Sequence, residues 1–266
     1  MPKKLLPFLA FSFCLLVSGV ALSSDLEREK RIAESIKDSI VIGDVVTLSA
    51  GSVEFIGLIN NEEPEHLRGS VIILHGMGSN PNAPQIVQPL RSQLAELGWA
   101  TASIQLPIAA QGASIDDNLA LIKESGSRIK SILGHMNENF QGKPCVLIAH
   151  SLGAVMVTHF LANQEKLACD ALVLIGLPTL ASDLPEAQSS EHLKKITIPT
   201  LDIYGSQDLD NVIQTAPLRR LALMKNNPLN RQVEISGADH VFNGLDETLA
   251  RSIHSWLAHT FKQATQ

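Results

Sequence analysis

From Ser70 onward the chain alternates short apolar runs with amphipathic segments, and this alternation constrains the fold more than any other feature. The apolar runs carry almost no charge, as in Pro144–Ala149 and Ala171–Ile175. Continuous apolar strands separated by helices are typical of a mostly parallel sheet that is covered by helices on both faces. We predict strands over 71–74, 100–106, 144–149, 171–175, 200–204 and 232–235, and helices over 85–97, 115–133, 154–163, 212–224 and 245–261.

The segment before this alternation predicts an N-terminal helix followed by a hairpin. Isoleucine recurs at every fourth position within residues 24–40, which indicates an amphipathic helix with one apolar stripe. Two β-like runs, over 41–48 and 53–59, follow it and are separated by a Gly/Ser-rich turn. Because no repeat, low-complexity tract or linker divides the chain, we predict a single domain over 24–266.

Residues 1–23 are typical of an export signal. A lysine pair precedes the apolar run Leu5–Val20, and small residues then allow cleavage after Ala21 or after Ser23. The alternative is an uncleaved membrane anchor, but the run is shorter than a span prefers and Pro7 interrupts it. We therefore expect a bacterial protein of the periplasm or the secreted fraction.

Export bears on the cysteines, because disulfides form in oxidising compartments. Removal of the signal would leave only Cys145 and Cys169, each near the start of a predicted strand. A disulfide between them and a pair of buried thiols both remain open.

Ser151 is the candidate nucleophile. It stands in Ala149-His150-Ser151-Leu152-Gly153, directly after an apolar strand and before a helix. The small residues Ala149 and Gly153 allow the tight turn that lifts a serine hydroxyl out of the sheet edge. The same turn would place the N–H of Leu152 at a helix N-terminus, where it could meet an oxyanion.

A second turn, His75-Gly76-Met77-Gly78, follows the first predicted parallel strand. Its glycines allow the backbone N–H groups to face an incoming carbonyl oxygen, so Met77 is our second candidate oxyanion donor. His75 is predicted to have a structural role, holding this loop through backbone hydrogen bonds. His150 is predicted to be packed inside the protein.

A serine hydroxyl needs a base, and the base needs an orienting acid. His240 follows the last predicted strand and is the candidate base, since its ordinary pKa lies near neutrality. Asp208 follows the preceding strand and is the candidate acid. Asp210 competes with it, whereas Asp202 lies inside the strand, too early to reach the site.

Composition excludes several other classes of function. The formal charge is −6 and there is only one tyrosine, which argues against a phosphate-tracking or base-stacking surface for nucleic acid. Histidines and carboxylates show no metal-ligand spacing; His254 and His259, five residues apart on one helix, would point to different faces. We expect neither a metal nor another cofactor.

These motifs resemble the α/β-hydrolase superfamily over nearly all of the chain after the signal. The resemblance is carried by residues 75–78, 149–153, 204–208 and 238–240. A narrower resemblance, over 75–82, 97–101 and 105–107, is to a group of exported proteobacterial hydrolase-like proteins classed as a domain of unknown function. The resemblance implies an α/β-hydrolase fold. Separately, the segment 177–196 is too short to form more than a minimal lid.

The motifs and the resemblance together predict a serine hydrolase that cleaves a carboxylic ester or related acyl bond through an acyl-enzyme, of the esterase, lipase or thioesterase type. The expected partner is a small-molecule or lipid-like acyl substrate. The sequence leaves open whether the protein also makes transient contact with a membrane surface. The alternative is a non-catalytic binding or envelope-associated protein that retains the fold. Nothing in the sequence indicates an oligomeric state.

Overall fold

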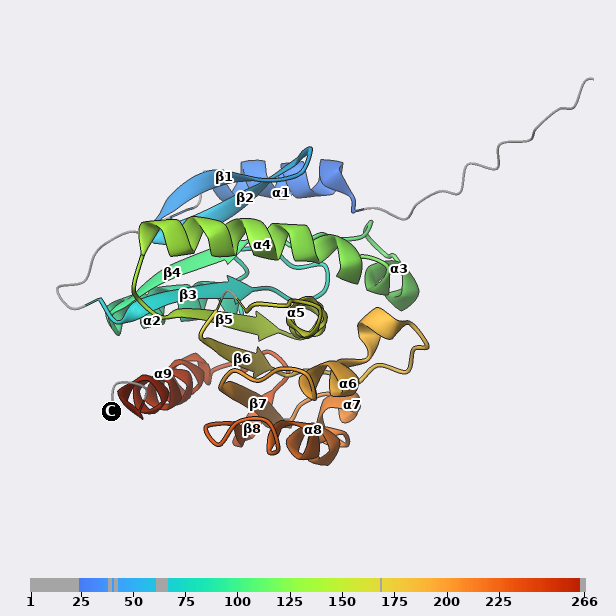
Figure 1. Ribbon diagram of the computed structural model, residues 1–266. Helices are drawn as coiled ribbons and strands as arrows, with labels where there is room; N and C mark the ends of the chain where they lie inside the picture. Colours follow the sequence, from blue (N-terminus) through green and yellow to red (C-terminus); the bar gives the residue numbers. More distant parts are fainter. Residues whose placement is uncertain (1–23, 38–39, 41–42, 61–66, 168, 264–266) are drawn as a thin grey trace, which may run out of the picture.

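The computed structural model describes residues 24–37, 40, 43–60, 67–167 and 169–263, and within them the strands form one eight-stranded sheet (Figure 1). The sheet order is β1-β2-β4-β3-β5-β6-β7-β8. Pairing is parallel from β4 through β8, and β1 and β2 form an antiparallel hairpin that joins the edge of β4. The strands are β1 (Asp44–Ala50), β2 (Val53–Asn60), β3 (Gly69–Leu74), β4 (Trp99–Ile104), β5 (Cys145–His150), β6 (Ala171–Ile175), β7 (Thr200–Gln207) and β8 (Arg231–Asp239).

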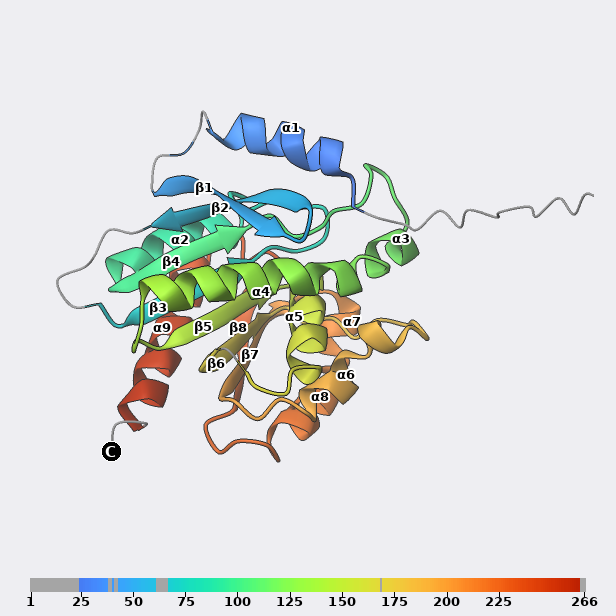
Figure 2. The same ribbon diagram turned by 45° about the horizontal axis from the view of Figure 1, so that its top comes forward.

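Helices cover both faces of this sheet (Figure 2). One face packs against α2 and α9, and the other packs against α4 and α5. The helices are α1 (Leu26–Lys37), α2 (Val87–Glu96), α3 (Ile115–Leu119), α4 (Ile122–Asn139), α5 (Leu152–Ala162), the 3₁₀ turn η1 (Pro185–Ala187), α6 (Ser189–Leu193), α7 (Asp210–Ile213), α8 (Ala216–Leu223) and α9 (Asp246–Gln263). The predicted fold class is confirmed, and the segment predicted to form at most a minimal lid contains only η1 and α6.

The central strands explain why the sequence is apolar without interruption there. In β3, Ile72 and Leu74 enter the core under α4 and α5, while Val71 and Ile73 enter the core under α2 and α9. Alternate residues of a strand face opposite sides, so a sheet covered on both sides needs apolar residues at every position. All residues of β3, β5 and β6 are buried as a result.

α1 lies outside the hairpin of β1 and β2, as Figure 2 shows. Ile36 is 5% exposed and packs with Ile56 and Leu58 of β2, and the half-buried Ile32 borders the same cluster. The predicted apolar stripe of this helix is therefore confirmed.

Two predicted helices prove to be broken. The helix predicted over 115–133 is α3 followed by α4, because the N–H of Leu121 donates to the carbonyl of Asn118, three residues back, and this interrupts the i to i−4 pattern of an α-helix. The helix predicted over 212–224 is α7 followed by α8. Pro217 lies in the first turn of α8, the position in a helix where its missing N–H costs least.

Other predictions have mixed outcomes. Cys145 and Cys169 are both buried free thiols, so the disulfide alternative is wrong for this structure although β5 and β6 are neighbours. The predicted export signal lies outside the described residues, so it and the division of the chain at residue 24 stay predictions. Of the helices in the described part, none is both long and apolar enough to cross a membrane.

Candidate active site

Ser151 occupies a strained turn between β5 and α5. Its backbone has φ 54° and ψ −123°, a conformation that costs a non-glycine residue about 1–3 kcal/mol. The turn is held in place because the Ser151 N–H donates to the carbonyl of Ile175 at 2.9 Å, while the N–H of Ala154 donates to the carbonyl of Ser151 at 2.9 Å. Strain that the surrounding structure maintains in this way is typical of functional positions.

The turn after β3 lies directly against Ser151. A Cβ added to Gly153 would lie 2.3 Å from the carbonyl oxygen of His75, so only glycine fits where α5 passes this loop. A Cβ added to Gly76 would lie 3.1 Å from Cβ of Ser151. The loop 75–80 and the serine turn are therefore in direct contact. Met77, the residue after Gly76, is exposed.

His240 connects Ser151 to Asp208. Its Nε2 lies 2.9 Å from Oγ of Ser151, and its Nδ1 lies 2.6 Å from Oδ1 of Asp208. A carboxylate accepts only, so Nδ1 carries the proton and Nε2 is left to accept from the serine hydroxyl. The three residues predicted from sequence are thus brought together in one hydrogen-bonded chain.

Asp208 is buried and remains a good acceptor. Burial alone would raise its pKa, but the hydrogen bond from His240 and the N–H groups of Leu209 and Gly205 outweigh burial and hold the pKa below its usual value. The competing carboxylate, Asp210, begins α7 and is exposed.

Two buried histidines support the loops around the triad. His75 Nε2 accepts from the N–H of Leu106 at 3.0 Å, so its Nδ1–H donates to the carbonyl of Gly76 at 2.7 Å. His150 Nε2–H donates to the carbonyl of His240 at 2.9 Å, and their rings lie 4.8 Å apart. The structural role predicted for His75 and the packed position predicted for His150 are both confirmed.

The predicted oxyanion donors lie on the two segments that meet at Ser151. Leu152 is the first residue of α5, where the backbone N–H groups have no partner within the helix. Met77 is in the turn that Ser79 N–H closes by donating to the carbonyl of Gly76 at 3.3 Å. Their role as a pair of donors stays a prediction.

Two exposed apolar side chains stand on the segments that carry or border the triad. Met77 is 52% exposed and Leu209, directly after Asp208, is 48% exposed. The segment between β6 and β7 contributes only η1 and the five-residue α6. In the described part of the chain, no cluster of three His, Cys, Asp or Glu side chains is placed to hold a metal.

Several buried polar contacts are not indicated by any local sequence pattern. Asp202 lies inside β7, as predicted, and forms an ion pair with Arg219 in which both side chains are completely buried. Glu29 of α1 pairs with Arg128 of α4 in the same way. These partners are far apart in the chain, so no local spacing could have indicated them.

The sequence profile of one family covers almost the whole chain. The family described as "Protein of unknown function (DUF3530)" matches residues 21–127 and 113–259. This chain belongs to that family. The narrower resemblance inferred from the sequence motifs is thereby confirmed, whereas no curated protein matches the sequence.

Solved structures show the same fold as this DUF3530 protein. Est1E from Butyrivibrio proteoclasticus has 15% identity and a TM-score of 0.62, with 82% of this chain and 99% of that one covered. Dienelactone hydrolase from Anabaena variabilis has 23% identity and a TM-score of 0.65, covering 82% and 97%. The Pyrococcus furiosus esterase Pf2001 has 16% identity and a TM-score of 0.65, covering 82% and 92%. The DUF3530 protein has the α/β-hydrolase fold.

Acid should destabilise this DUF3530 protein through its buried histidines. Burial lowers the pKa of His75 and of His150 to about 4, whereas an unfolded histidine titrates near 6.5. Between these values the unfolded chain binds more protons, so the free energy of unfolding falls as the pH falls from about 6.5 to about 4. Each histidine lowers the free energy of unfolding by roughly 1 kcal/mol per pH unit in that window, and by nothing further below it.

Urea unfolding at about pH 7.5 and about pH 5 measures this loss. A His150→Gln variant, which has one fewer titrating group, should lose less stability between the two pH values than the wild type. Equal losses in both proteins would contradict the assignment to His150.

Proposed function

We propose that this protein is a serine hydrolase that cleaves a carboxylic ester or related acyl bond through an acyl-enzyme. The observation that carries the proposal is the continuous Ser151–His240–Asp208 chain on a strained turn, with contacts of 2.9 and 2.6 Å. A buried carboxylate, an imidazole with its acceptor nitrogen on a serine, and a serine at a helix N-terminus are the parts of nucleophilic acyl transfer.

In the proposed reaction, Ser151 Oγ attacks the carbonyl carbon and its proton passes to Nε2 of His240. The electron pair of the C=O bond moves to oxygen, where the N–H groups of Met77 and Leu152 stabilise the charge. Collapse of this intermediate expels the leaving alcohol, which takes the proton from His240. Water then attacks the acyl-serine by the same proton path and frees the acid. The reaction uses no cofactor.

The substrate that we propose is a small or lipid-like acyl compound. The short helices between β6 and β7 and the exposed side chains of Met77 and Leu209 favour an apolar group beside the ester rather than a deeply enclosed substrate. The similar solved structures include proteins titled esterases and a dienelactone hydrolase, which supports ester chemistry. A periplasmic or secreted location and transient contact with a membrane surface are further parts of the proposal.

A fluorophosphonate probe tests the proposed nucleophile directly, because it reacts with an activated serine without requiring the natural substrate. We expect covalent labelling of the wild-type protein, with the adduct on Ser151, and no labelling of Ser151→Ala or His240→Ala. Circular dichroism of the two variants is the control for folding. An unlabelled wild type with an intact fold would contradict the proposal and favour a binding protein that retains the hydrolase fold.

A further inference from the structure

Arg28, in the first turn of α1, joins two loops at the carboxyl ends of the central strands. Its Nη1 donates to the carbonyl of Ala109, in the loop after β4, at 2.6 Å. Its Nη2 donates to the carbonyl of Gly78, in the loop after β3, at 3.1 Å. The guanidinium is suited to this contact because it presents several donors in one rigid plane.

The loop that Arg28 holds through Gly78 is the one that carries Met77. Ser79 N–H donates to the carbonyl of Gly76 across this turn, and Gly78 has φ 64° at its third position. A turn with positive φ at that position is the type that requires glycine. Fixing the carbonyl of Gly78 therefore restrains the turn 76–79, which contains Met77 and whose first residue, Gly76, lies against Ser151.

The first turn of α1 is itself anchored to the loop after β4. The N–H of Asp25 donates to the carbonyl of Ile108 at 2.8 Å, and Glu29 Oε1 accepts from the N–H of Ile108 at 3.2 Å. Glu29 Oε2 accepts from Nη1 of Arg128 at 2.7 Å, and both side chains are buried. The buried ion pair between Glu29 and Arg128 therefore holds in place the helix that carries Arg28.

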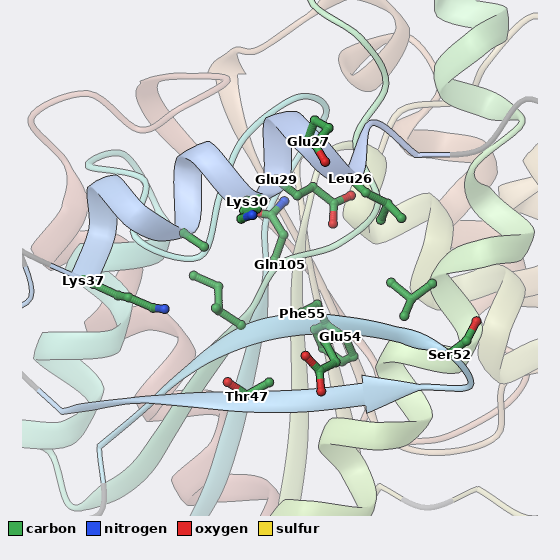
Figure 3. A pocket seen from close by; sticks show the side chains of 13 residues that line it. Leu26, Glu27, Glu29, Lys30, Lys37, Thr47, Ser52, Glu54, Phe55 and Gln105 are labelled. Carbon is green, nitrogen blue, oxygen red and sulfur yellow. The ribbon is translucent and has the colours of Figure 1, made fainter.

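Toward the hairpin, by contrast, α1 borders a cavity. A space of about 370 Å³ lies between the helix and β1–β2, and Figure 3 shows Leu26 and Glu29 on the helix side and Phe55 on the strand side. The apolar contact with the hairpin centres on Ile36, near the other end of the helix. The polar contacts to the loops after β3 and β4 therefore fix the position of the first turn of α1.

We propose that Arg28 is a positioning residue of the hydrolase site. It holds the turn 76–79 so that the N–H of Met77 faces the oxyanion that forms on the acyl carbon. This inference rests on the proposed function. It assigns to the N-terminal helix a role in the reaction that no catalytic motif of the sequence indicates.

Arg28→Met tests the proposal, with Arg31→Met as the matched control because Arg31 is exposed on the same helix. Hydrolysis of p-nitrophenyl butyrate should show kcat lowered about tenfold to a hundredfold in Arg28→Met, somewhat less than the loss of a whole oxyanion donor. KM should stay within about twofold, since the lost interaction acts in the transition state. Arg28→Lys, whose compact ammonium can reach only one of the two carbonyls at a time, should recover part of kcat.

A second variant separates positioning from general loosening of the helix. Ile36→Ala weakens the packing of α1 on β2 and should lower the melting temperature without lowering kcat. Hydrogen exchange of the peptide covering residues 75–83 should be faster in Arg28→Met than in wild type and unchanged in Arg31→Met. This readout does not depend on catalysis.

Two results would overturn the inference while leaving the proposed function intact. The first is a labelled, active wild type with unchanged kcat and exchange in Arg28→Met. The second is a loss of kcat in Ile36→Ala as large as that in Arg28→Met. If the wild type shows neither fluorophosphonate labelling nor ester hydrolysis, the proposed function fails and the role of Arg28 fails with it.

Discussion

Asp208→Asn should lower the turnover of an ester substrate by about 10⁴-fold while leaving the fold intact. The carboxylate of Asp208 lies 2.6 Å from Nδ1 of His240 and accepts its proton. An asparagine amide can instead donate to Nδ1, which would move the proton to Nε2, the nitrogen that must accept from Ser151. It would also remove the negative charge that stabilises the imidazolium formed during attack.

The matched control is Asp210→Asn, since Asp210 was the competing candidate and lies at the exposed start of α7. Its turnover should stay within about twofold of wild type. Steady-state hydrolysis of p-nitrophenyl butyrate and the rate of fluorophosphonate labelling measure both variants. A large loss in Asp210→Asn together with a small one in Asp208→Asn would transfer the role of the acid to Asp210.

Asp202→Ala should cost about 3–5 kcal/mol of the free energy of unfolding, although Asp202 takes no part in the reaction. Its Oδ2 accepts from Nε of Arg219 at 2.9 Å and from Nε2 of Gln232 at 2.8 Å. Both members of the ion pair have side chains that are 0% exposed. Removing the carboxylate leaves the guanidinium buried with no opposite charge, which is more damaging than losing the pair as a whole.

The double variant Asp202→Leu with Arg219→Met tests this reasoning. Replacing both members with apolar side chains removes the buried charges together, so its stability should lie much closer to wild type than that of Asp202→Ala. Urea unfolding measures all three proteins. If the double variant were as unstable as the single one, the cost would come from packing rather than from the unpaired charge.

Local sequence patterns were enough to predict that Ser151, His240 and Asp208 lie together. Ser151 stands between an apolar strand and a helix, and Asp208 and His240 each follow a later strand. In a parallel sheet these strand ends meet at one edge, so position in the alternation predicts proximity. The outward turn at Ser151 was also foreseeable, because small residues flank it on both sides.

The buried ion pairs could not be predicted by the same reasoning. Charged residues on an amphipathic helix are ordinarily expected on its solvated face, yet Glu29 and Arg128 are 5% and 1% exposed. Their pairing joins residues 99 positions apart. Nor does periodicity show that α3 ends where α4 begins, because that break is a local change of backbone hydrogen bonding at Leu121.

The sequence alone therefore determined the class of fold, the order of its strands and helices along the chain, and the three residues brought together at the sheet edge. These follow from hydrophobic period and turn chemistry, which act over a few neighbouring residues. Only the tertiary structure decided that α1 reaches the loops after β3 and β4 through Arg28, and that Cys145 and Cys169 are buried free thiols. Contacts between distant segments depend on how whole elements pack, and no short stretch of sequence contains that information.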